Sequence, residues 1–290
     1  MFSKILVPLD GGEAAETALH WVKFYGRKCH SMAVLLHVSP EERTGSGFRR
    51  VAAALDAQEY LQGIERELTY AGIPVRILTT TGPVAEGIAK TARREKCDLV
   101  VMATRGPTGL SRWLSKGVTD QVMRLSRTPL LVLGHRTLKA RDGRLRHIVV
   151  PLDDSERSHS MLPWAERLAR LHRARLIFLH VYPSRPGPSP SAAERACEIL
   201  RRRMDAVCED LRSRGVRAEF RPQPGDPATE ISWIPNMSDA VAMTTRGRSG
   251  FRRLVSGSVA EDVVRRTTVP VFIYRTPALV ARPLPEPAGV

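Results

Sequence analysis

Short apolar runs alternate along the chain with longer segments in which apolar residues recur at helical spacing. In the first half, the runs that read as buried strands occupy residues 5–9, 33–38, 75–79, 98–103 and 129–133. The segments predicted to form helices between them are residues 14–25, 48–70, 84–95 and 118–126. Strands that alternate with helices at this spacing pair in parallel through right-handed crossovers, so the pattern predicts a doubly wound α/β sheet.

The same pattern is written twice. KILVPLD at residues 4–10 returns as HIVVPLD at 147–153, and VLLHV at 34–38 returns as IFLHV at 177–181, both at an offset of 143 residues. The strands predicted in the second copy are residues 147–152, 175–181, 217–221, 239–243 and 269–274. An internal repeat of this length predicts two tandem Rossmann-like domains, each with a five-stranded parallel sheet.

The positions of the glycines show where the two copies of the repeat differ in length. Gly72 and Gly215 end the second helix of each copy in C-cap position and keep the offset of 143, whereas Gly106 and Gly247 differ by 141. Two residues are therefore missing from the third helix of the second copy, which also contains the helix breaker Pro235.

The repeat divides the chain into four parts. We expect a first domain at residues 1–134, a polar and basic linker at 135–146, a second domain at 147–275 and a proline-rich tail at 276–290.

Composition narrows the classes of function. The chain has 290 residues, a formal net charge of +15 and 6% aromatic residues. The charge favours anionic partners, yet no helix-turn-helix, zinc-finger or RNP-like pattern occurs, so we expect no specific nucleic-acid binding. No apolar run is long enough for a membrane span, and the first strand begins too early for a signal peptide. These features predict a cytoplasmic protein with no membrane partner.

The cysteines predict neither a metal site nor a disulfide framework. Cys29, Cys97, Cys197 and Cys208 form no C-x-x-C pair. Cys197 and Cys208 are eleven residues apart and so share one helix face, and we expect the thiols to be buried and reduced.

The stretch with the clearest chemical character is TTRGRSGFRRLVSGSV, from Thr244 to Val259. It follows an apolar strand and precedes a helix predicted at 260–266, at the position where open α/β sheets bind anions. Gly247, Gly250 and Gly257 allow a phosphate to approach the backbone closely. An ordinary connecting loop is the alternative, and no P-loop motif occurs in the chain.

This loop resembles the nucleotide-binding signature of the universal stress protein family, G-x2-G-x9-G-[ST]. Thr244 replaces the first glycine, whereas Gly247, Gly257 and Ser258 match. KILVPLD and the strand LLHV are also typical of this family, so the resemblance covers nearly the whole chain.

The resemblance implies a bound adenine nucleotide, with ATP as the expected ligand, with or without Mg²⁺. The implied binding residues are Asp153, Val181, Met243, Thr244, Gly247, Gly257, Ser258 and Val259 in the second domain, and Asp10, Val38, Gly106 and Gly117 in the first. The resemblance implies that the aspartates lie at the adenine and ribose end of the nucleotide, and that the valines line the base.

Several of these residues also have a simpler interpretation. Asp10 and Asp153 could serve only as N-caps of the helices that follow them. His37 and His180 lie inside apolar strands and are better explained as core residues than as catalytic bases, because no nucleophile accompanies them. We therefore predict no catalytic residue and no metal ligand.

The two copies differ at the loop. Lys116 stands opposite Gly257, Gly117 opposite Ser258 and Ala103 opposite Thr244. A lysine where the backbone should touch a phosphate predicts weaker binding in the first domain.

The leading interpretation is a stress-response regulatory protein that binds ATP or a related adenine nucleotide. A slow ATPase or phosphotransferase and a nucleotide-free interaction protein are the alternatives. In single-domain relatives the fifth strand commonly forms the dimer contact, so we expect the two domains of this chain to pair as an intramolecular pseudo-dimer, with homodimers and an unknown protein partner as further candidates.

Overall fold

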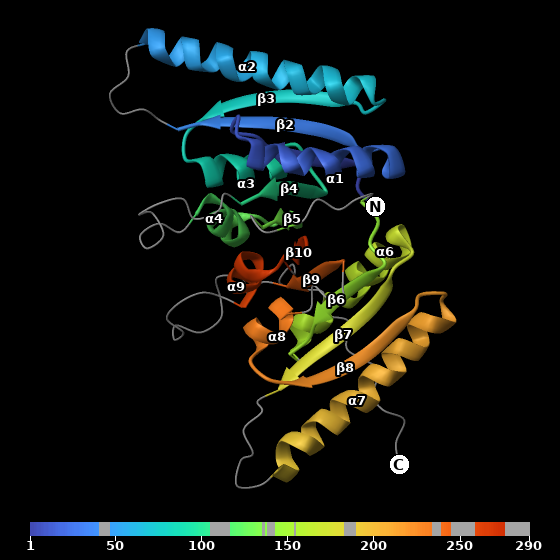
Figure 1. Ribbon diagram of the computed structural model, residues 1–290. Coiled ribbons are helices and arrows are strands. Elements are labelled where there is room, and N and C mark those ends of the chain that lie inside the picture. The colour runs from blue at the N-terminus through green and yellow to red at the C-terminus, as the bar shows by residue number, and fades with distance from the viewer. Residues whose placement is uncertain are drawn as a thin grey trace. The chain divides into compact units, whose positions relative to one another are not determined.

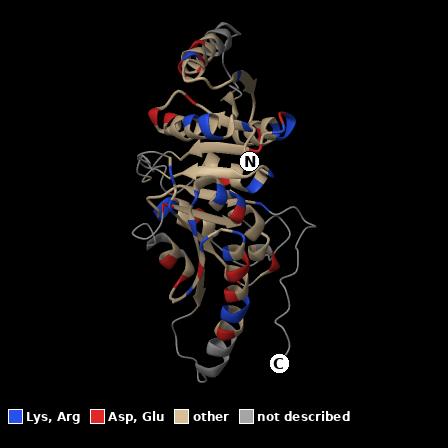
Figure 2. Ribbon diagram, turned by 90° about the vertical axis from the view of Figure 1, so that its right-hand side faces the viewer, with Lys and Arg blue, Asp and Glu red and all other residues tan. Residues whose placement is uncertain are grey.

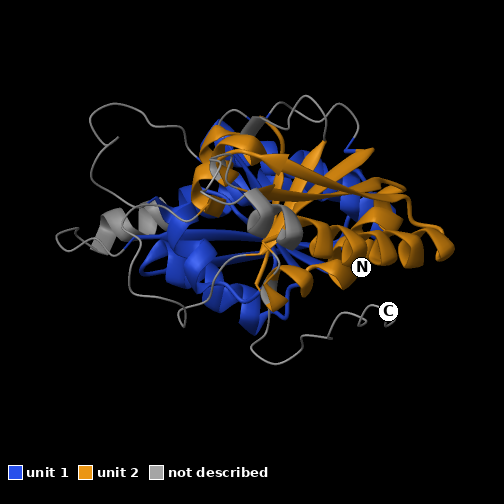
Figure 3. Ribbon diagram, turned by 90° about the horizontal axis from the view of Figure 1, so that it is seen from below, with its two compact units in different colours: residues 1–143 blue, residues 144–290 orange. Residues whose placement is uncertain are grey.

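The computed structural model describes residues 1–40, 47–104, 117–134, 137, 143–153, 155–182, 190–233, 239–244 and 259–275. The chain divides into two compact units, residues 1–143 and 144–290 (Figure 3). Each unit is an α/β domain with a five-stranded parallel sheet, as the sequence predicts.

Unit 1 has the strand order β3-β2-β1-β4-β5 (Figure 1). Its strands are β1 (Lys4–Pro8), β2 (Met32–Ser39), β3 (Val75–Thr81), β4 (Leu99–Ala103) and β5 (Leu130–Leu133), and its helices are α1 (Glu13–Cys29), α2 (Gly47–Tyr70), α3 (Val84–Arg94) and α4 (Val118–Leu125). The chain steps outward from β1 to β3 and then returns to β4 and β5. Right-handed crossovers therefore place α1 and α2 on one face of the sheet and α3 and α4 on the other, where α3 packs against α4.

Unit 2 repeats this order as β8-β7-β6-β9-β10. Its strands are β6 (His147–Pro151), β7 (Arg175–Tyr182), β8 (Ala218–Pro224), β9 (Ala240–Thr244) and β10 (Val271–Tyr274), and its helices are α5 (Glu156–His159), α6 (Leu162–His172), α7 (Pro190–Ser213), α8 (Pro227–Trp233) and α9 (Val259–Arg266). The same crossover rule places α6 and α7 on one face and α8 and α9 on the other, and α8 packs against α9.

The core of each unit is the apolar sheet beneath these helices. The central strands β1 and β6 share the burial pattern of three fully buried residues flanked by two partly exposed ones. In Figure 2 the segments coloured for Lys, Arg, Asp and Glu lie mainly on helices, whereas the strands are drawn largely in tan. This distribution is expected for parallel strands that are covered on both faces.

One carboxylate in each unit fixes the start of the central strand. Asp98 Oδ2 accepts hydrogen bonds from the backbone N–H groups of Ser3 and Lys4, at 2.7 and 3.0 Å. Asp239 Oδ2 does the same for Arg146 and His147, at 2.6 and 2.9 Å. These bonds tie the amino ends of neighbouring strands together, in the same way in both units.

The helix C-caps predicted at Gly72 and Gly215 are confirmed. Their φ angles are +79° and +80°, in the left-handed region that favours glycine. In each case the glycine N–H bonds back to a carbonyl of the preceding turn, at 2.9 Å for Gly72 and 2.8 Å for Gly215. The turn ends the long helix and returns the chain to the edge strand.

The units differ in the first helix after the central strand. Unit 1 has one continuous helix, α1, whereas unit 2 has the short helix α5 followed by α6. Pro163 lies in the first turn of α6, where its missing N–H is tolerated. The repeat alone implied one helix in both places. Pro235, predicted to shorten the third helix of the second copy, lies outside the described residues.

None of the helices in the described part of the chain is long and apolar enough to cross a membrane.

The expectation that all four thiols are buried is wrong for Cys29 and Cys197, which are partly exposed. Cys208 shares a helix face with Cys197 but is buried, because burial also depends on what covers each part of the helix.

Candidate nucleotide site

The topology of each sheet creates one position where loops diverge. In unit 1 the neighbouring strands β1 and β4 pair with Leu6 opposite Val100, and the helices that follow these two strands lie on opposite faces. In unit 2 the same relationship joins β6 and β9, with Val149 opposite Val241. A crevice at the carboxyl ends of two such strands is the usual ligand site of an open α/β sheet.

The aspartates predicted for the site lie at this edge. Asp153 follows β6, is exposed, and its Oδ1 accepts hydrogen bonds from the N–H and the hydroxyl of Ser155, at 3.2 and 2.5 Å. In unit 1, Asp10 Oδ1 accepts from the N–H of Gly12 at 3.0 Å. Each carboxylate thereby closes a tight turn directly after the central strand.

The interpretation of these aspartates as N-caps is wrong. The N-cap of α1 is Gly12, which makes no side-chain capping bond, and the N-cap of α5 is Ser155, whose Oγ accepts from the N–H of Ser158 at 3.2 Å. The aspartates lie two residues before the caps, because the chain needs a turn between strand and helix. Both aspartates therefore stabilise the turn between strand and helix, and neither of them caps the helix.

His37 and His180 position this loop. Nδ1 of His37 lies 3.0 Å from the carbonyl oxygen of Leu9, and Nδ1 of His180 lies 3.0 Å from that of Leu152. Each imidazole donates across the strand pair to the residue before the aspartate, so it links the carboxyl ends of the first two strands. This contact supports the prediction that the histidines are structural.

The two valines predicted to contact the base lie on the neighbouring strands. Val38 is 8% exposed and pairs in register with Thr80 of β3, whereas Val181 is partly exposed and pairs with Gln223 of β8. The described structure places each of them next to the histidine that contacts the loop. Met243 is buried near the end of β9, and Thr244 follows it as the last strand residue, partly exposed.

The helices that follow the loops begin at predicted site residues. Val259 is the first residue of α9 and is 40% exposed, and Gly117 is the N-cap of α4. The first turns of both helices also carry acids, among them the buried Asp120 and Glu261. Because these carboxylates offset the positive helix dipole, phosphate binding here would depend mainly on the loop itself.

The loop residues themselves are not described. Gly247, Gly257 and Ser258 of unit 2, and Gly106 and Lys116 of unit 1, lie outside the described residues. The structure describes the two residues that flank the loop of unit 2, which are Thr244 at the end of β9 and Val259 at the start of α9.

A tyrosine that sequence reasoning missed lies near the site in unit 1. The Tyr60 hydroxyl on α2 donates to Glu16 Oε1 on α1 at 3.0 Å. Burial raises the pKa of this phenol above its ordinary value, and the nearby carboxylates of Glu16 and Asp10 raise it further. No sequence signal could identify this pair, because it joins two helices 44 residues apart.

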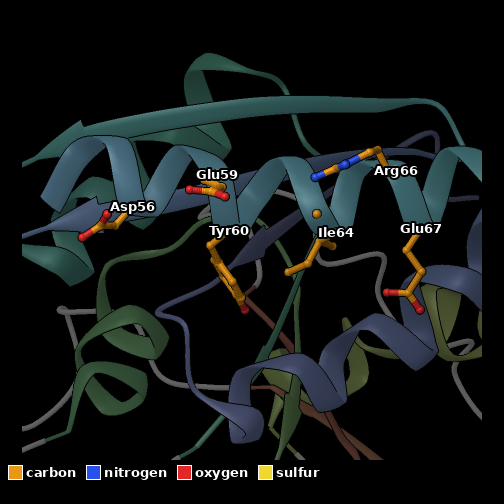
Figure 4. Close-up of a pocket in the computed structure, with 7 residues that line it drawn as sticks. Asp56, Glu59, Tyr60, Ile64, Arg66 and Glu67 are labelled. Atoms are coloured by element: carbon orange, nitrogen blue, oxygen red, sulfur yellow. The ribbon is translucent and has the colours of Figure 1, made fainter. Parts of the chain in front are cut away.

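The same helix forms a shallow depression of about 520 Å³ (Figure 4). It is lined by Asp56, Glu59, Tyr60, Gly63, Ile64, Arg66 and Glu67. Three of these side chains are acidic and one is basic, so the surface repels a polyanionic ligand. We do not place the nucleotide there.

Within the described ranges, no group of three or more His, Cys, Asp or Glu side chains is arranged to hold a metal ion.

Comparison with known proteins matches this architecture to one family. The profile of the universal stress protein family matches residues 1–134 and again residues 144–275. The chain belongs to the universal stress protein family. It contains two copies of the family's domain, so the resemblance found in the sequence is confirmed for both halves.

Individual relatives agree with this assignment. A universal stress protein of Methanocaldococcus jannaschii is 29% identical over 154 residues, which cover 46% of this chain and 95% of that protein. A universal stress protein of Mycolicibacterium smegmatis is 23% identical over 285 residues and covers 93% of this chain and 96% of its own length. The second match spans both domains, as expected for a tandem member of the family.

A solved structure shows the same fold. The crystal structure of a universal stress protein from Archaeoglobus fulgidus superposes with a TM-score of 0.77 at 19% identity, over 94% of this chain and 96% of that one. At this identity the likeness concerns the fold alone.

Proposed function

We propose that this universal stress protein is a regulatory protein that binds an adenine nucleotide, with ATP as the expected ligand and unit 2 as the main site. The observation that carries the proposal is the position of Asp153 and Val181. Both lie at the carboxyl edge of the sheet beside the β6–β9 switch point, and the glycine signature follows the end of β9.

The charge of the loop supports a phosphate-bearing ligand. Residues 245–258 include Arg246, Arg248, Arg252 and Arg253 and no acidic residue. Arginine side chains bind phosphate oxygens through two parallel hydrogen bonds, and glycines leave backbone N–H groups accessible. A basic, glycine-containing loop is therefore suited to a di- or triphosphate.

Hydrolysis is the second candidate function. It would need a positioned base or a metal cluster, and no residue in the described part of the site supplies one by its geometry. We therefore propose that the nucleotide is retained as a signal and is not hydrolysed. Any Mg²⁺ at the site would bind as part of the nucleotide, through its phosphates.

The experiment that tests the proposal has two stages. Mass spectrometry of small molecules released by denaturing the purified protein should detect an adenine nucleotide. Calorimetry should then show that Gly257→Leu weakens ATP binding at least tenfold, because a bulky side chain blocks close approach of the phosphates. Unchanged affinity in that variant would contradict the assignment of the site, and steady phosphate release above background would favour the hydrolase.

A further inference from the structure

The two units differ beside the valine that is proposed to contact the base. The offset of 143 residues places Glu230 of α8 in the position of Gly87 of α3. The backbone is equivalent at the two positions. The N–H of Gly87 donates to Pro83 at 2.9 Å, and that of Glu230 donates to Asp226 at 2.8 Å.

In unit 1 this position leaves little space for a side chain. A Cβ atom on Gly87 would lie 3.0 Å from Val38 Cγ1 and 3.6 Å from Thr80 Cγ2. The helix therefore packs directly over the paired residues Val38 and Thr80. The three atoms nearest to this position in unit 1 are methyl carbons of Val38 and Thr80.

In unit 2 the equivalent position carries a carboxylate that faces the strand ends. Glu230 Oε2 accepts from Gln223 Nε2 at 3.3 Å, and Gln223 is the residue paired in register with Val181. The side chain also lies over Gly225, where an added Cβ would come within 2.5 Å of Glu230 Cγ. Gly225 has a φ of +148°, so glycine fits this position both by conformation and by space.

The environment of Glu230 differs from that of the ion-paired glutamates of unit 2. Glu230 is partly exposed, and among the described residues it forms no ion pair. By contrast, Glu166 binds Arg170 and Arg214, and Glu219 binds Arg175 and Arg221. A carboxylate held by a neutral amide keeps capacity to accept further hydrogen bonds from a ligand.

We propose that Glu230, oriented by Gln223, is a specificity residue that accepts a hydrogen bond from the 6-amino group of the adenine base in unit 2. This inference rests on the proposed nucleotide site, because it assumes that the base lies against Val181. A site built to bond a polar group of its ligand rejects the analogue that lacks the group, since its own polar atoms then stay unpaired. Unit 1, with Gly87 and Thr80, should not make this distinction.

The test compares ATP with purine riboside triphosphate, which lacks only the 6-amino group. Both compete against photolabelling by 8-azido-ATP on the full chain, and peptide mapping assigns the label to residues 144–275 or to unit 1. In unit 2 we expect ATP to compete at about tenfold lower concentration than the analogue, a ratio that corresponds to about 1.4 kcal/mol. In unit 1 we expect nearly equal competition.

Two variants examine the residue itself. Glu230→Gly copies unit 1, and Glu230→Gln keeps the size of the side chain but replaces one acceptor oxygen with a donor. Glu230→Gly should lower the ratio in unit 2 to within about twofold of one, and Glu230→Gln, which keeps one acceptor oxygen, should lower it to an intermediate value, while the affinity for the analogue stays the same. Circular dichroism checks that both variants are folded, and Glu86→Gly, an exposed change in the corresponding helix of unit 1, is the matched control.

The outcomes separate the two proposals. An unchanged ratio in both variants, or an equal loss of affinity for ATP and for the analogue, would overturn the role of Glu230 and leave the nucleotide site in place. If ATP does not protect the wild-type chain from labelling, the proposed function itself falls, and this inference with it.

Discussion

His180 Nδ1 lies 3.0 Å from the carbonyl oxygen of Leu152, the residue immediately before Asp153. The bond joins the carboxyl end of β7 to the loop after β6. It therefore links the strand residue before Val181, which we propose to contact the base, to the residue before Asp153, which we propose to contact the ribose.

Replacing His180 by Phe should lower both stability and nucleotide affinity. The variant keeps a planar ring but loses the donor, and we expect a decrease of about 1 kcal/mol in the free energy of unfolding. ATP affinity in unit 2 should fall about threefold to tenfold because the turn that holds Asp153 is less restrained. Urea denaturation and calorimetry measure the two effects.

His37→Phe is the matched control in unit 1. It removes the equivalent bond to Leu9 and should cost a similar free energy of unfolding. It should leave ATP binding in unit 2 unchanged. Equal ATP affinity in His180→Phe and wild type would show that the bond does not position the site.

A glycine inside α2 and a glycine just after its end should respond in opposite directions to the same substitution. Gly63 lies inside the helix and Gly72 ends it at a φ of +79°, and a Cβ atom on either would meet nothing within 4 Å. Gly63→Ala should raise the free energy of unfolding by about 0.5–1 kcal/mol, because alanine favours the helix. Gly72→Ala should lower it by about 1 kcal/mol, because alanine disfavours the left-handed conformation.

Thermal unfolding of both variants, followed by circular dichroism, checks this prediction. Gly63 is also one of the residues that line the depression in Figure 4, so an effect there reports on the helix and not on a ligand. Changes of the same sign in the two variants would contradict the assignment of Gly72 as a left-handed C-cap.

The strands and helices could be predicted because their signals are local. Predicted and observed strands agree within a few residues, and the largest difference is at β8, expected at 217–221 and observed at Ala218–Pro224. The additional strand residues are Pro222, Gln223 and Pro224. Glutamine is polar and proline has no N–H group, so neither residue type predicts a strand, although both are tolerated at the edge of a sheet. The break between α5 and α6 had a local signal in Pro163 that the repeat concealed.

The site was only partly predictable for a different reason. Asp153 is proposed from its place after an apolar strand and Val181 from the family resemblance, but the contact between Glu230 and Gln223 depends on how a helix packs over a strand end. The same is true of Asp98 and Asp239, which bind strand starts more than 90 residues away in the sequence. Neither kind of contact leaves a periodic pattern.

The thiols should react in two classes. Burial raises the pKa of Cys97 and of Cys208 from 9.0 to about 11, with smaller opposing and reinforcing effects from neighbouring charges. At pH 8 about one in a thousand of these thiols is ionised, and both are buried, whereas Cys29 and Cys197 are partly exposed. A thiol-reactive disulfide reagent should therefore label two sites quickly and two slowly.

The same shifts predict an alkaline effect on stability. Since the folded-state pKa values lie above the ordinary value, the unfolded chain loses these protons first as the pH rises. The free energy of unfolding should fall between about pH 9 and pH 11, and a Cys97→Ala, Cys208→Ala double variant should show a smaller decrease. Rapid labelling of all four thiols in the folded protein at pH 8, located by peptide mapping, would contradict the assigned burial.

The last prediction concerns the proposed difference in affinity between the two candidate nucleotide sites. Gly117 is the N-cap of α4 with φ −58° and ψ 162°, angles that any residue can adopt, and an added Cβ atom there would meet nothing within 4 Å. Serine therefore fits this position, as Ser258 does by sequence before Val259 in unit 2. Its hydroxyl can cap the helix or donate to a phosphate. Lys116→Gly together with Gly117→Ser should raise ATP affinity in unit 1 about tenfold, since a hydrogen bond to a charged group contributes about 1.5–3 kcal/mol.

The matched control is Lys116→Gly with Gly117→Ala, which adds the Cβ atom without the hydroxyl and should give a smaller gain. Calorimetry on the full chain, with peptide mapping of photolabelled product to assign each site, measures the effect. If the native protein already binds two ATP molecules with equal affinity, Lys116 does not impair the first site, and the backbone amides of both loops must reach the phosphates equally well.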